Sequence, residues 1–393
     1  VGLVIAAKDG NIVGKSNVFL EGRRNAVRTE ETNLGNISSD ANLWYAKKYD
    51  PKVSISLKNG GGIRSAVGYV NSVGSNVILE RNQANPSAGK SAGDVSQLDV
   101  ENSLRFNNSL VIVSVSAAGV KRLIEHSISA SKPGLTPGQF PQVGGVSFSY
   151  DTTKTSGNKI WSMVLIDSLG NSKDTIVKYG KLIGDTSRTY KIVTLNFLAN
   201  PSFVGSSVGG DNYPFPTVVR ARVDLDTAIK SAGTSSFSLI GREQDAFAEY
   251  MLAKHNTSLK AYKVRDTSVM GDTRIQLINA RPDAIFPKLS SFSLLTPANN
   301  SRVAVKDADP TPVTITWEKS TGATRYVWIL DLPSGNFKTP LLTLQSNNNG
   351  KNNDLTLTSG GISSALAGLG VILGDSINLK WTVKAYQEGH DSL

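Results

Sequence analysis

The sequence lacks cysteine entirely and has only three histidines among its 393 residues. Without cysteine, a disulfide scaffold, a thiolate nucleophile and every cysteine-ligated metal site are excluded. His126, His255 and His390 are too few for a histidine-rich metal centre, and we expect His126 to be structural because it lies in a helical pattern. A two-metal hydrolytic centre needs a cluster of Asp, His and Asn ligands, which this chain does not supply.

Long apolar runs are also absent. No stretch of 18 apolar residues occurs, so the sequence predicts no membrane span. The first ten residues, VGLVIAAKDG, lack the basic region and the small-residue cleavage site of a signal peptide, and there is no initiator methionine. We therefore expect the chain to be a processed or excised piece of a longer protein.

Positive charge is present in excess but is unevenly distributed. The formal net charge is +10, yet residues 291–393 hold eight basic and eight acidic residues, so the whole excess lies in residues 1–290. A basic region joined to a neutral one suggests that the first part meets an anion, such as a polynucleotide or a phosphate ester. The plainer alternative is a solvated surface with a modest positive bias.

Residues 1–287 predict an α+β domain, because helices and strands do not alternate in the regular way of a doubly wound sheet. Expected helices cover 36–49, with Ser38 or Ser39 as the cap, 118–130 and 242–255. Expected strands cover 52–59 (half-buried), 109–115 (buried), 145–151, 160–166, 189–195 and 274–280.

Two segments of this domain resemble inserted, mobile surface excursions, 68–91 and 200–208. From residue 288 the pattern changes to short strands rich in Thr, Val and Trp and separated by turns, which is typical of a β-sandwich. One helical stretch, 362–370, interrupts it. We therefore predict two domains, 1–287 and 288–393, the second one truncated.

Arginine and glycine form the first candidate site. Arg23, Arg24 and Arg28 are close in sequence, and the last two are spaced so that both guanidinium groups can face one anion. Gly60-Gly61-Gly62 follows a strand and precedes Arg64; the glycines allow a positive φ and a close approach of a ligand to the backbone. The alternatives are a solvated charged surface and a plain tight turn.

Aromatic residues at strand ends form the second candidate. Phe106 and Asn108 precede the strand at 109, and Phe197 follows the strand 189–195, with Asp211 downstream in GGDNY. Two such rings could sandwich a flat ligand while Asn and Asp read its edge. The alternative is that both phenylalanines are core residues, which is their commoner fate.

Together these segments resemble the C-terminal domain of the 5′-nucleotidase family over roughly residues 10–287. The resemblance rests on GRRNAVRTEETNLGN (22–36), KNGGGIR (58–64), AGDVS (92–96), RFNNSLVIV (105–113), FPQVGGVSFSYD (140–151), YKIVTLNFLA (190–199) and GGDNY (209–213). It implies a fold in which helices and sheets form a sandwich, and a pocket for nucleotides or nucleosides.

The resemblance also implies roles for seven residues. Phe106 and Phe197 would stack on the nucleobase, Asn108 and Asp211 would contact the base or ribose, and the phosphate or ribose side would be held by Arg24, Arg28 and Arg64. Hydrolysis in the family belongs to an N-terminal domain with two divalent metals. We expect that domain, which is missing here, to be the partner of this chain, and we expect the chain alone to hold no cofactor and to be inactive.

One departure from the family pattern concerns the first stacking loop. The usual Pro-Phe-Gly-Asn reads Arg105-Phe106-Asn107-Asn108, which is expected to reshape the loop and to add charge beside the base. The insertion 68–91 is expected at the pocket edge. Both changes bear on which nucleotide is preferred.

Residues from about 290 to 393 resemble, more weakly, the SusE-type immunoglobulin-like modules of surface glycan-binding proteins. This second resemblance implies an extracytoplasmic setting: periplasm, cell surface or secreted. An alternative function remains, a non-catalytic adhesin or carbohydrate-binding protein whose working part is the sandwich. Polynucleotide binding is the weakest alternative, since the chain has no continuous stripe of aromatic and basic residues.

Overall fold

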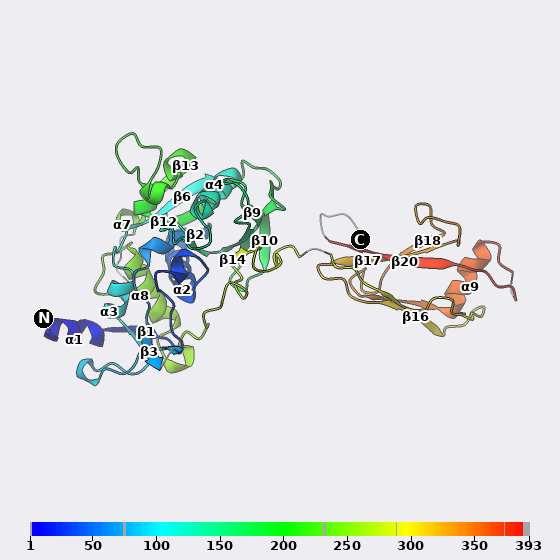
Figure 1. The fold of residues 1–393 in the computed structure, drawn as a ribbon, viewed down its shortest axis with the longest axis horizontal. Coiled ribbons are helices and arrows are strands. Elements are labelled where there is room, and N and C mark those ends of the chain that lie inside the picture. The colour runs from blue at the N-terminus through cyan, green and yellow to red at the C-terminus, as the bar shows by residue number, and fades with distance from the viewer. Residues whose placement is uncertain are drawn as a thin grey trace. The chain divides into compact units, whose positions relative to one another are not determined.

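The computed structural model describes residues 2–73, 76–229, 231, 233–287, 289–372 and 374–387, so His390 lies outside the described residues. The chain divides into two compact units, residues 1–285 (unit 1) and 286–393 (unit 2) (Figure 1). The sequence pattern placed this boundary two residues later. No helix in the described ranges is both long and apolar enough to cross a bilayer.

The centre of unit 1 is a five-stranded sheet of order β13-β6-β12-β2-β7. Its members are β13 (Val219–Asp224), β6 (Leu110–Ser116), β12 (Thr189–Leu195), β2 (Val53–Asn59) and β7 (Pro141–Gly144). β2 runs parallel to β12 and antiparallel to β7, so both of its edges are paired. The expectation of a half-buried β2 is wrong: only Ser54 is partly exposed, because the strand is internal to the sheet.

A second five-stranded sheet of unit 1 has the order β11-β10-β9-β8-β14. Its members are β11 (Lys181–Leu182), β10 (Ser172–Lys178), β9 (Ile160–Ile166), β8 (Val146–Tyr150) and β14 (Ile275–Leu277). Ile55 and Val113 of the first sheet share one hydrophobic core with Phe148, Met163 and Ile176 of the second. The two sheets therefore form a single folded body.

Helices α2 (Asn33–Tyr49), α4 (Ala117–Ile128) and α8 (Glu243–Lys254) cover the expected helical segments. The start of α2 differs: Thr32 is the cap and accepts a hydrogen bond from the Gly35 N–H at 3.0 Å, whereas Ser38 and Ser39 are buried inside the helix. Thr32 reaches the free N–H groups one turn earlier than either serine could. The helix ends before Pro51, as the sequence predicts.

The remaining elements of unit 1 are short. They are α1 (Gly2–Gly10), β1 (Ile12–Lys15) paired with β5 (Asp94–Ser96), α3 (Gln97–Ser103), α5 (Asn196–Ala199), α6 (Phe215–Val218) and α7 (Leu225–Ala228). β1, β5 and α3 pack near α8 around a smaller core that includes Val13, Val95, Val100 and Met251. This smaller core joins the start of the chain to its middle.

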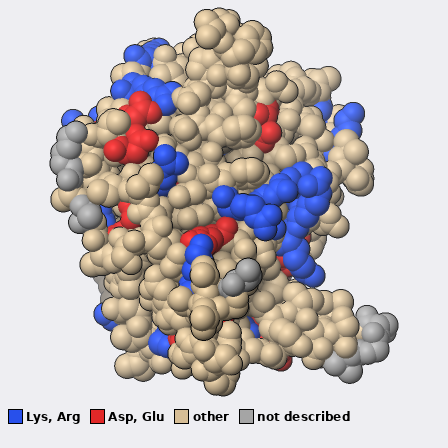
Figure 2. Space-filling view, turned by 90° about the vertical axis from the view of Figure 1, so that its left-hand side faces the viewer, with Lys and Arg blue, Asp and Glu red and all other residues tan. Residues whose placement is uncertain are grey.

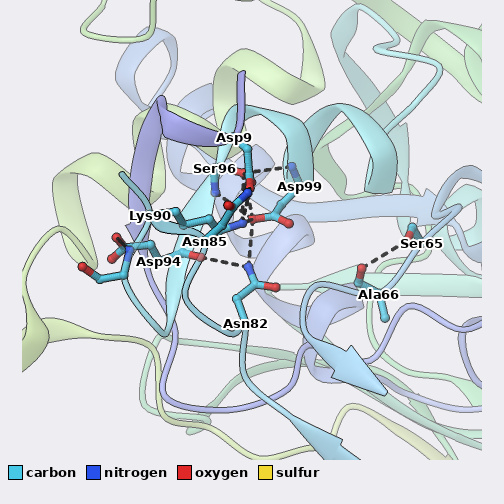
Figure 3. Close-up of polar contacts among 10 residues, drawn as sticks. Asp9, Ser65, Ala66, Asn82, Asn85, Lys90, Asp94, Ser96 and Asp99 are labelled. Carbon is cyan, nitrogen blue, oxygen red and sulfur yellow. Dashed lines mark hydrogen bonds and ion pairs between the residues drawn. The ribbon is translucent and has the colours of Figure 1, made fainter. Parts of the chain in front are cut away.

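The segment 68–91 is only partly the surface excursion that the sequence suggests. β3 (Tyr69–Val73) and β4 (Asn76–Glu80) form an exposed hairpin. Residues 82–91, by contrast, are tied down: Lys90 is buried and its Nζ contacts Asp9, Asp99 and Ser96 (Figure 3). Polar composition suggested a loose loop here, but the polar groups are satisfied by one another.

Unit 2 contains two three-stranded sheets, of order β15-β16-β19 and β18-β17-β20. The strands are β15 (Leu294–Thr296), β16 (Pro312–Trp317), β17 (Arg325–Asp331), β18 (Leu342–Gln345), β19 (Asp354–Thr358) and β20 (Lys380–Tyr386), with α9 at Ser359–Gly368. Trp317 and Leu355 of one sheet share a core with Tyr326, Trp328 and Val383 of the other. The immunoglobulin-like assignment remains a prediction.

Candidate functional site

The arginine segment divides into paired and unpaired side chains. Arg23 is bound to Glu21 through an ion pair of 2.5 Å and is thereby neutralised. Arg24 is exposed and makes no hydrogen bond or ion pair with the other described residues. A shallow pocket of about 380 Å³ is lined by Arg23, Arg24, Asn25, Ala26 and Glu30. Among the described residues, Arg24 is therefore an exposed cation of this segment without a counter-ion.

Arg28 lies deeper than its neighbours. Its Nη1 donates to the Thr136 carbonyl at 3.4 Å, and its Nε is buried without a hydrogen-bond acceptor in the described part of the chain. Burial lowers the pKa of Arg28, the charges of Arg24 and Arg64 lower it further, and Asp211 raises it. These four groups therefore share one electrostatic environment, although they come from three distant segments.

The glycine turn works differently from the expectation. Residues 60–62 form a 3₁₀ turn in which none of the three glycines has a positive φ. Instead, a Cβ on Gly60 would lie 1.8 Å from the Val27 carbonyl oxygen, and one on Gly61 would lie 2.8 Å from the Gly138 carbonyl oxygen. The glycines allow three backbone segments of the protein itself to pack together.

Phe106 lies on the loop between α3 and β6 and is 59% exposed, so the core alternative is wrong for this ring. The Arg64 guanidinium carbon lies 5.6 Å from its centroid, within cation–π distance. Asn107 has φ 45°, a left-handed conformation that asparagine tolerates better than most residues. The asparagine thus fills a position that would otherwise favour glycine.

Asn108, next along this loop, points its side-chain amide at α8. Its Nδ2 donates to Glu243 Oε1 at 3.0 Å, and its backbone N–H donates to the same oxygen at 3.2 Å. Glu243 is itself paired with Lys58, both side chains being fully buried. The loop is therefore fixed by a buried acid.

Phe197 belongs to α5 and is 45% exposed, so the second ring is not a core residue either. A Cβ placed on Gly210 would lie 2.4–2.5 Å from atoms of the Phe197 ring. The ring therefore lies directly over the Gly210 backbone. Within the described residues, the rings of Phe106 and Phe197 make no contact with each other.

Asp211 directly follows that glycine and has a left-handed backbone, φ 50°. Its Oδ2 accepts a hydrogen bond of 2.6 Å from Asn59 Nδ2, and its carbonyl oxygen accepts one of 2.9 Å from His126 Nε2. His126 also packs edge-on against Tyr213, and burial lowers its pKa. The expectation that His126 is structural is consistent with this geometry, because the ring holds the Asp211 loop.

Asn59 is the site residue that the sequence argument did not single out. It is the last residue of β2, and its Oδ1 is buried with no hydrogen-bond donor among the described residues. Its position between a strand and three glycines was the available signal. The structure thus joins Arg28, Asn59 and Asp211, sets Arg64 against Phe106, and sets Phe197 against the Asp211 turn.

Charge and metal-binding capacity complete the description. Figure 2 shows a face of the molecule on which lysine and arginine side chains gather beside smaller acidic groups. In the described ranges, no group of three or more His, Asp or Glu residues is placed to hold a metal ion. The side chains of the candidate site are of the kinds that bind anionic or aromatic ligands.

Comparison with known proteins gives one family match. Residues 12–204 match the family model described as 5′-nucleotidase, C-terminal domain. The resemblance drawn from the sequence extends further, to residue 287, so Asp211 lies beyond the matched range.

Several curated proteins are similar over about half of the chain. The trifunctional nucleotide phosphoesterase protein YfkN of Bacillus subtilis (strain 168) is 30% identical over 54% of this chain and 12% of its own length. The human 5′-nucleotidase is 30% identical over 51% of this chain and 30% of its own length. A snake venom 5′-nucleotidase of Crotalus adamanteus is 24% identical over 58% of this chain and 33% of its own length. The chain thus spans a third or less of these relatives.

Among solved structures, a 5′-nucleotidase precursor from the bacterium Thermus thermophilus aligns with a TM-score of 0.48 and 23% identity. That alignment covers 70% of this chain and 41% of the other chain. The Haemophilus influenzae NAD nucleotidase aligns with a TM-score of 0.45 and 15% identity, over 69% and 38% of the two chains.

Proposed function

Residues 12–204 belong to the 5′-nucleotidase C-terminal-domain family, and from this premise we propose that unit 1 is the nucleotide-binding portion of a nucleotidase-like phosphohydrolase. The ligand is a nucleotide or nucleoside. In this proposal Phe106 and Phe197 stack on the base, and Asn108 and Asp211 contact the base or ribose. The phosphate or ribose side is held by Arg24, Arg28 and Arg64.

The observation that carries the proposal is the meeting of Arg28, Asn59 and Asp211. Asn59 donates a hydrogen bond to Asp211, and the charge of Asp211 raises the pKa of Arg28. A buried arginine Nε and a buried asparagine Oδ1, both without hydrogen-bond partners in the described ranges, lie in this cluster. Buried polar groups normally find partners, so these two unpartnered atoms support the proposal of a ligand position in this cluster.

The chemistry of the surrounding groups suits a nucleotide. An exposed aromatic ring gives about 1–3 kcal/mol per stacked base. Arginine binds phosphate through short charge-assisted hydrogen bonds, and Arg24 and Arg64 are exposed and able to do so. A carboxylate such as Asp211 accepts hydrogen bonds from ribose hydroxyls. The proposed site thus combines stacking, charge and hydroxyl recognition.

Hydrolysis is proposed to occur in another domain of the same protein. A two-metal centre needs several carboxylate and imidazole ligands, and the described residues of this chain gather no such set. The chain also spans only 30% of the human 5′-nucleotidase. We therefore propose that this chain binds and orients the nucleotide, and that the two divalent metals belong to an N-terminal domain outside it.

The proposal also covers the cellular location of the protein and the nature of unit 2. Relatives include venom 5′-nucleotidases, which supports an extracytoplasmic location in the periplasm, at the cell surface or in secretion. We propose that unit 2 is an immunoglobulin-like module, because two three-stranded sheets share one core. Expression of the full-length protein followed by cell fractionation would test the location.

The binding proposal is tested by isothermal titration of the chain with adenosine and AMP. Phe106→Ala and Phe197→Ala should each weaken adenosine binding about 5- to 150-fold, the equivalent of about 1–3 kcal/mol. Tyr49→Ala is the control, because Tyr49 is an aromatic residue of similar exposure, 48%, at the end of α2. No binding by the unaltered chain, or equal binding by all three variants, would refute the assignment.

A phosphate-release assay tests the division of labour. We expect no release of phosphate from AMP by this chain, with or without added divalent metal. Sustained turnover by the chain that survives repurification, and that is lost in the Arg28→Met variant, would overturn the proposal that catalysis lies elsewhere.

A further inference from the structure

The orientation of the Asn108 side chain is fixed by hydrogen bonding. Glu243 Oε1 accepts from Asn108 Nδ2 at 3.0 Å and from the Asn108 backbone N–H at 3.2 Å, while the Glu243 N–H donates to the Asn108 carbonyl at 2.9 Å. An ionised carboxylate only accepts hydrogen bonds. The end of the Asn108 amide that meets Glu243 must therefore be the NH₂ group.

Glu243 is held as a charged acceptor by Lys58. Lys58 Nζ lies 3.1 Å from Glu243 Oε2, and neither side chain is exposed. A carboxylate buried this deeply remains ionised only with a paired cation, and removing one member of such a pair leaves an uncompensated charge. Lys58 directly precedes Asn59, which contacts Asp211. The pair therefore links the Asn108 loop to the opposite part of the site.

The other end of the amide is left for a ligand. Asn108 Oδ1 accepts no hydrogen bond from the described residues and is not among their buried unpartnered atoms, so it is not fully enclosed by the protein. Asn108 follows the exposed Phe106 by two residues on the same loop. The site therefore presents a fixed acceptor on the same loop as the ring on which a base would stack.

We infer that the Lys58–Glu243 pair, by fixing Asn108, makes the site select nucleobases with an exocyclic amino group, adenine or cytosine, over their oxo counterparts. This inference rests on the proposed nucleotide site. An exocyclic amino group donates to Oδ1, whereas an oxo group in the same place would set two acceptors against each other. Asn108 is the reading residue, and Lys58 and Glu243 are positioning residues.

Arg105 would favour the opposite choice. Its guanidinium group is beside Phe106 in sequence, and it could donate to an oxo group. However, Arg105 is exposed and forms no hydrogen bond or ion pair with other described residues, so nothing holds its guanidinium in place. A fixed acceptor discriminates better than a free donor, because the free donor can turn to water.

Adenosine and inosine test the inference. Adenosine has an amino group at position 6, whereas inosine has an oxo group there and a proton on the adjacent ring nitrogen, and the two bases stack with similar area. Titration of the unaltered chain should show adenosine binding about tenfold tighter than inosine, which corresponds to about 1.4 kcal/mol. Equal affinities, or tighter inosine binding, would overturn the inference while leaving the nucleotide site in place. If neither nucleoside binds, the proposed function itself fails.

Variants identify the cause of the preference. The double variant Lys58→Met/Glu243→Leu replaces the buried pair by apolar groups of similar volume. The Asn108 amide is then free to turn, and the ratio of adenosine to inosine affinity should fall to about one. Lys58→Met/Glu243→Gln keeps an acceptor oxygen for Asn108 and should retain the tenfold ratio. Circular dichroism and the melting temperature show whether each variant folds.

Asn108→Ala removes the acceptor and should also give a ratio near one, in a variant that keeps the buried pair intact. If the ratio persists in Asn108→Ala but collapses in Arg105→Ala, the arginine reads the base and the inference is wrong.

Discussion

Lys90 offers the sharpest test of how segment 82–91 is held. Its Nζ lies 2.7 Å from Asp9 Oδ1, 2.8 Å from Asp99 Oδ2 and 3.2 Å from Ser96 Oγ (Figure 3). The Lys90 side chain is only 6% exposed. Lys90→Met therefore leaves two carboxylates facing each other without a cation between them.

The expected loss follows from that arrangement. Breaking a buried ion pair by removing one member costs about 3–5 kcal/mol, and we expect the lower end, about 3 kcal/mol, because both carboxylates keep some contact with solvent. For unit 1 this lowers Tm by roughly 6–12 °C. The matched control is Lys8→Met, which breaks the more exposed Lys8–Glu101 pair and should cost less than about 1 kcal/mol.

The pH dependence separates charge from packing. Burial alone would raise the pKa of Asp9, but hydrogen bonds from Lys90, Asn85 and Ser96 outweigh it and hold the pKa below its usual value. A depressed carboxyl pKa contributes stability above about pH 4, which is lost as the pH falls through the folded-state value. The difference between wild type and Lys90→Met, measured by urea unfolding, should therefore shrink from pH 7 to pH 3. A difference below about 1 kcal/mol at pH 7, or one that is unchanged at pH 3, would refute the reasoning.

Three further changes have defined outcomes. Gly210→Ala should displace the Phe197 ring and weaken adenosine binding in titration, while Tm falls by only a few degrees. Asn107→Val should destabilise unit 1 by at least about 1 kcal/mol in urea unfolding, because a β-branched residue strains at φ 45°. Burial, and then the charge of Glu31, raise the pKa of Asp272 to about 8, so its proton is lost on unfolding and stability should decline as the pH rises from 4 to 8. Asp272→Asn should remove that decline in a series of urea titrations.

Much of the secondary structure could be predicted because apolar patterns are local. The residue limits expected for β9 and β12 are those observed, since each contains several apolar residues and is bounded by polar ones. The sequence predicts a half-buried β2 because Ser56 and Lys58 alternate with apolar residues and so suggest a solvent-facing side. Both are buried, and Lys58 finds its counter-ion 185 residues away. No local pattern contains that pairing.

The site could be predicted as a set of residues but not as an arrangement. Arginines before a helix and phenylalanines at strand ends are visible in the sequence, and the structure leaves both Phe106 and Phe197 exposed. The contact of Asn59 with Asp211 joins residues 152 positions apart, and it depends on the closing of the glycine turn against two other backbone segments. Such contacts follow from tertiary packing, which spacing alone does not determine.

The parallel pairing of β2 with β12 has a consequence for folding during synthesis. β2 ends at Asn59 and β12 begins at Thr189, so the middle of the central sheet stays open until well over a hundred further residues have left the ribosome. Contacts this distant in sequence form late and leave apolar strands uncovered in the meantime. The proposed nucleotide site at the end of β2 can therefore form only after β12 has been synthesised. A nucleoside in the growth medium of a secreting host should then raise the yield of folded protein by mass action.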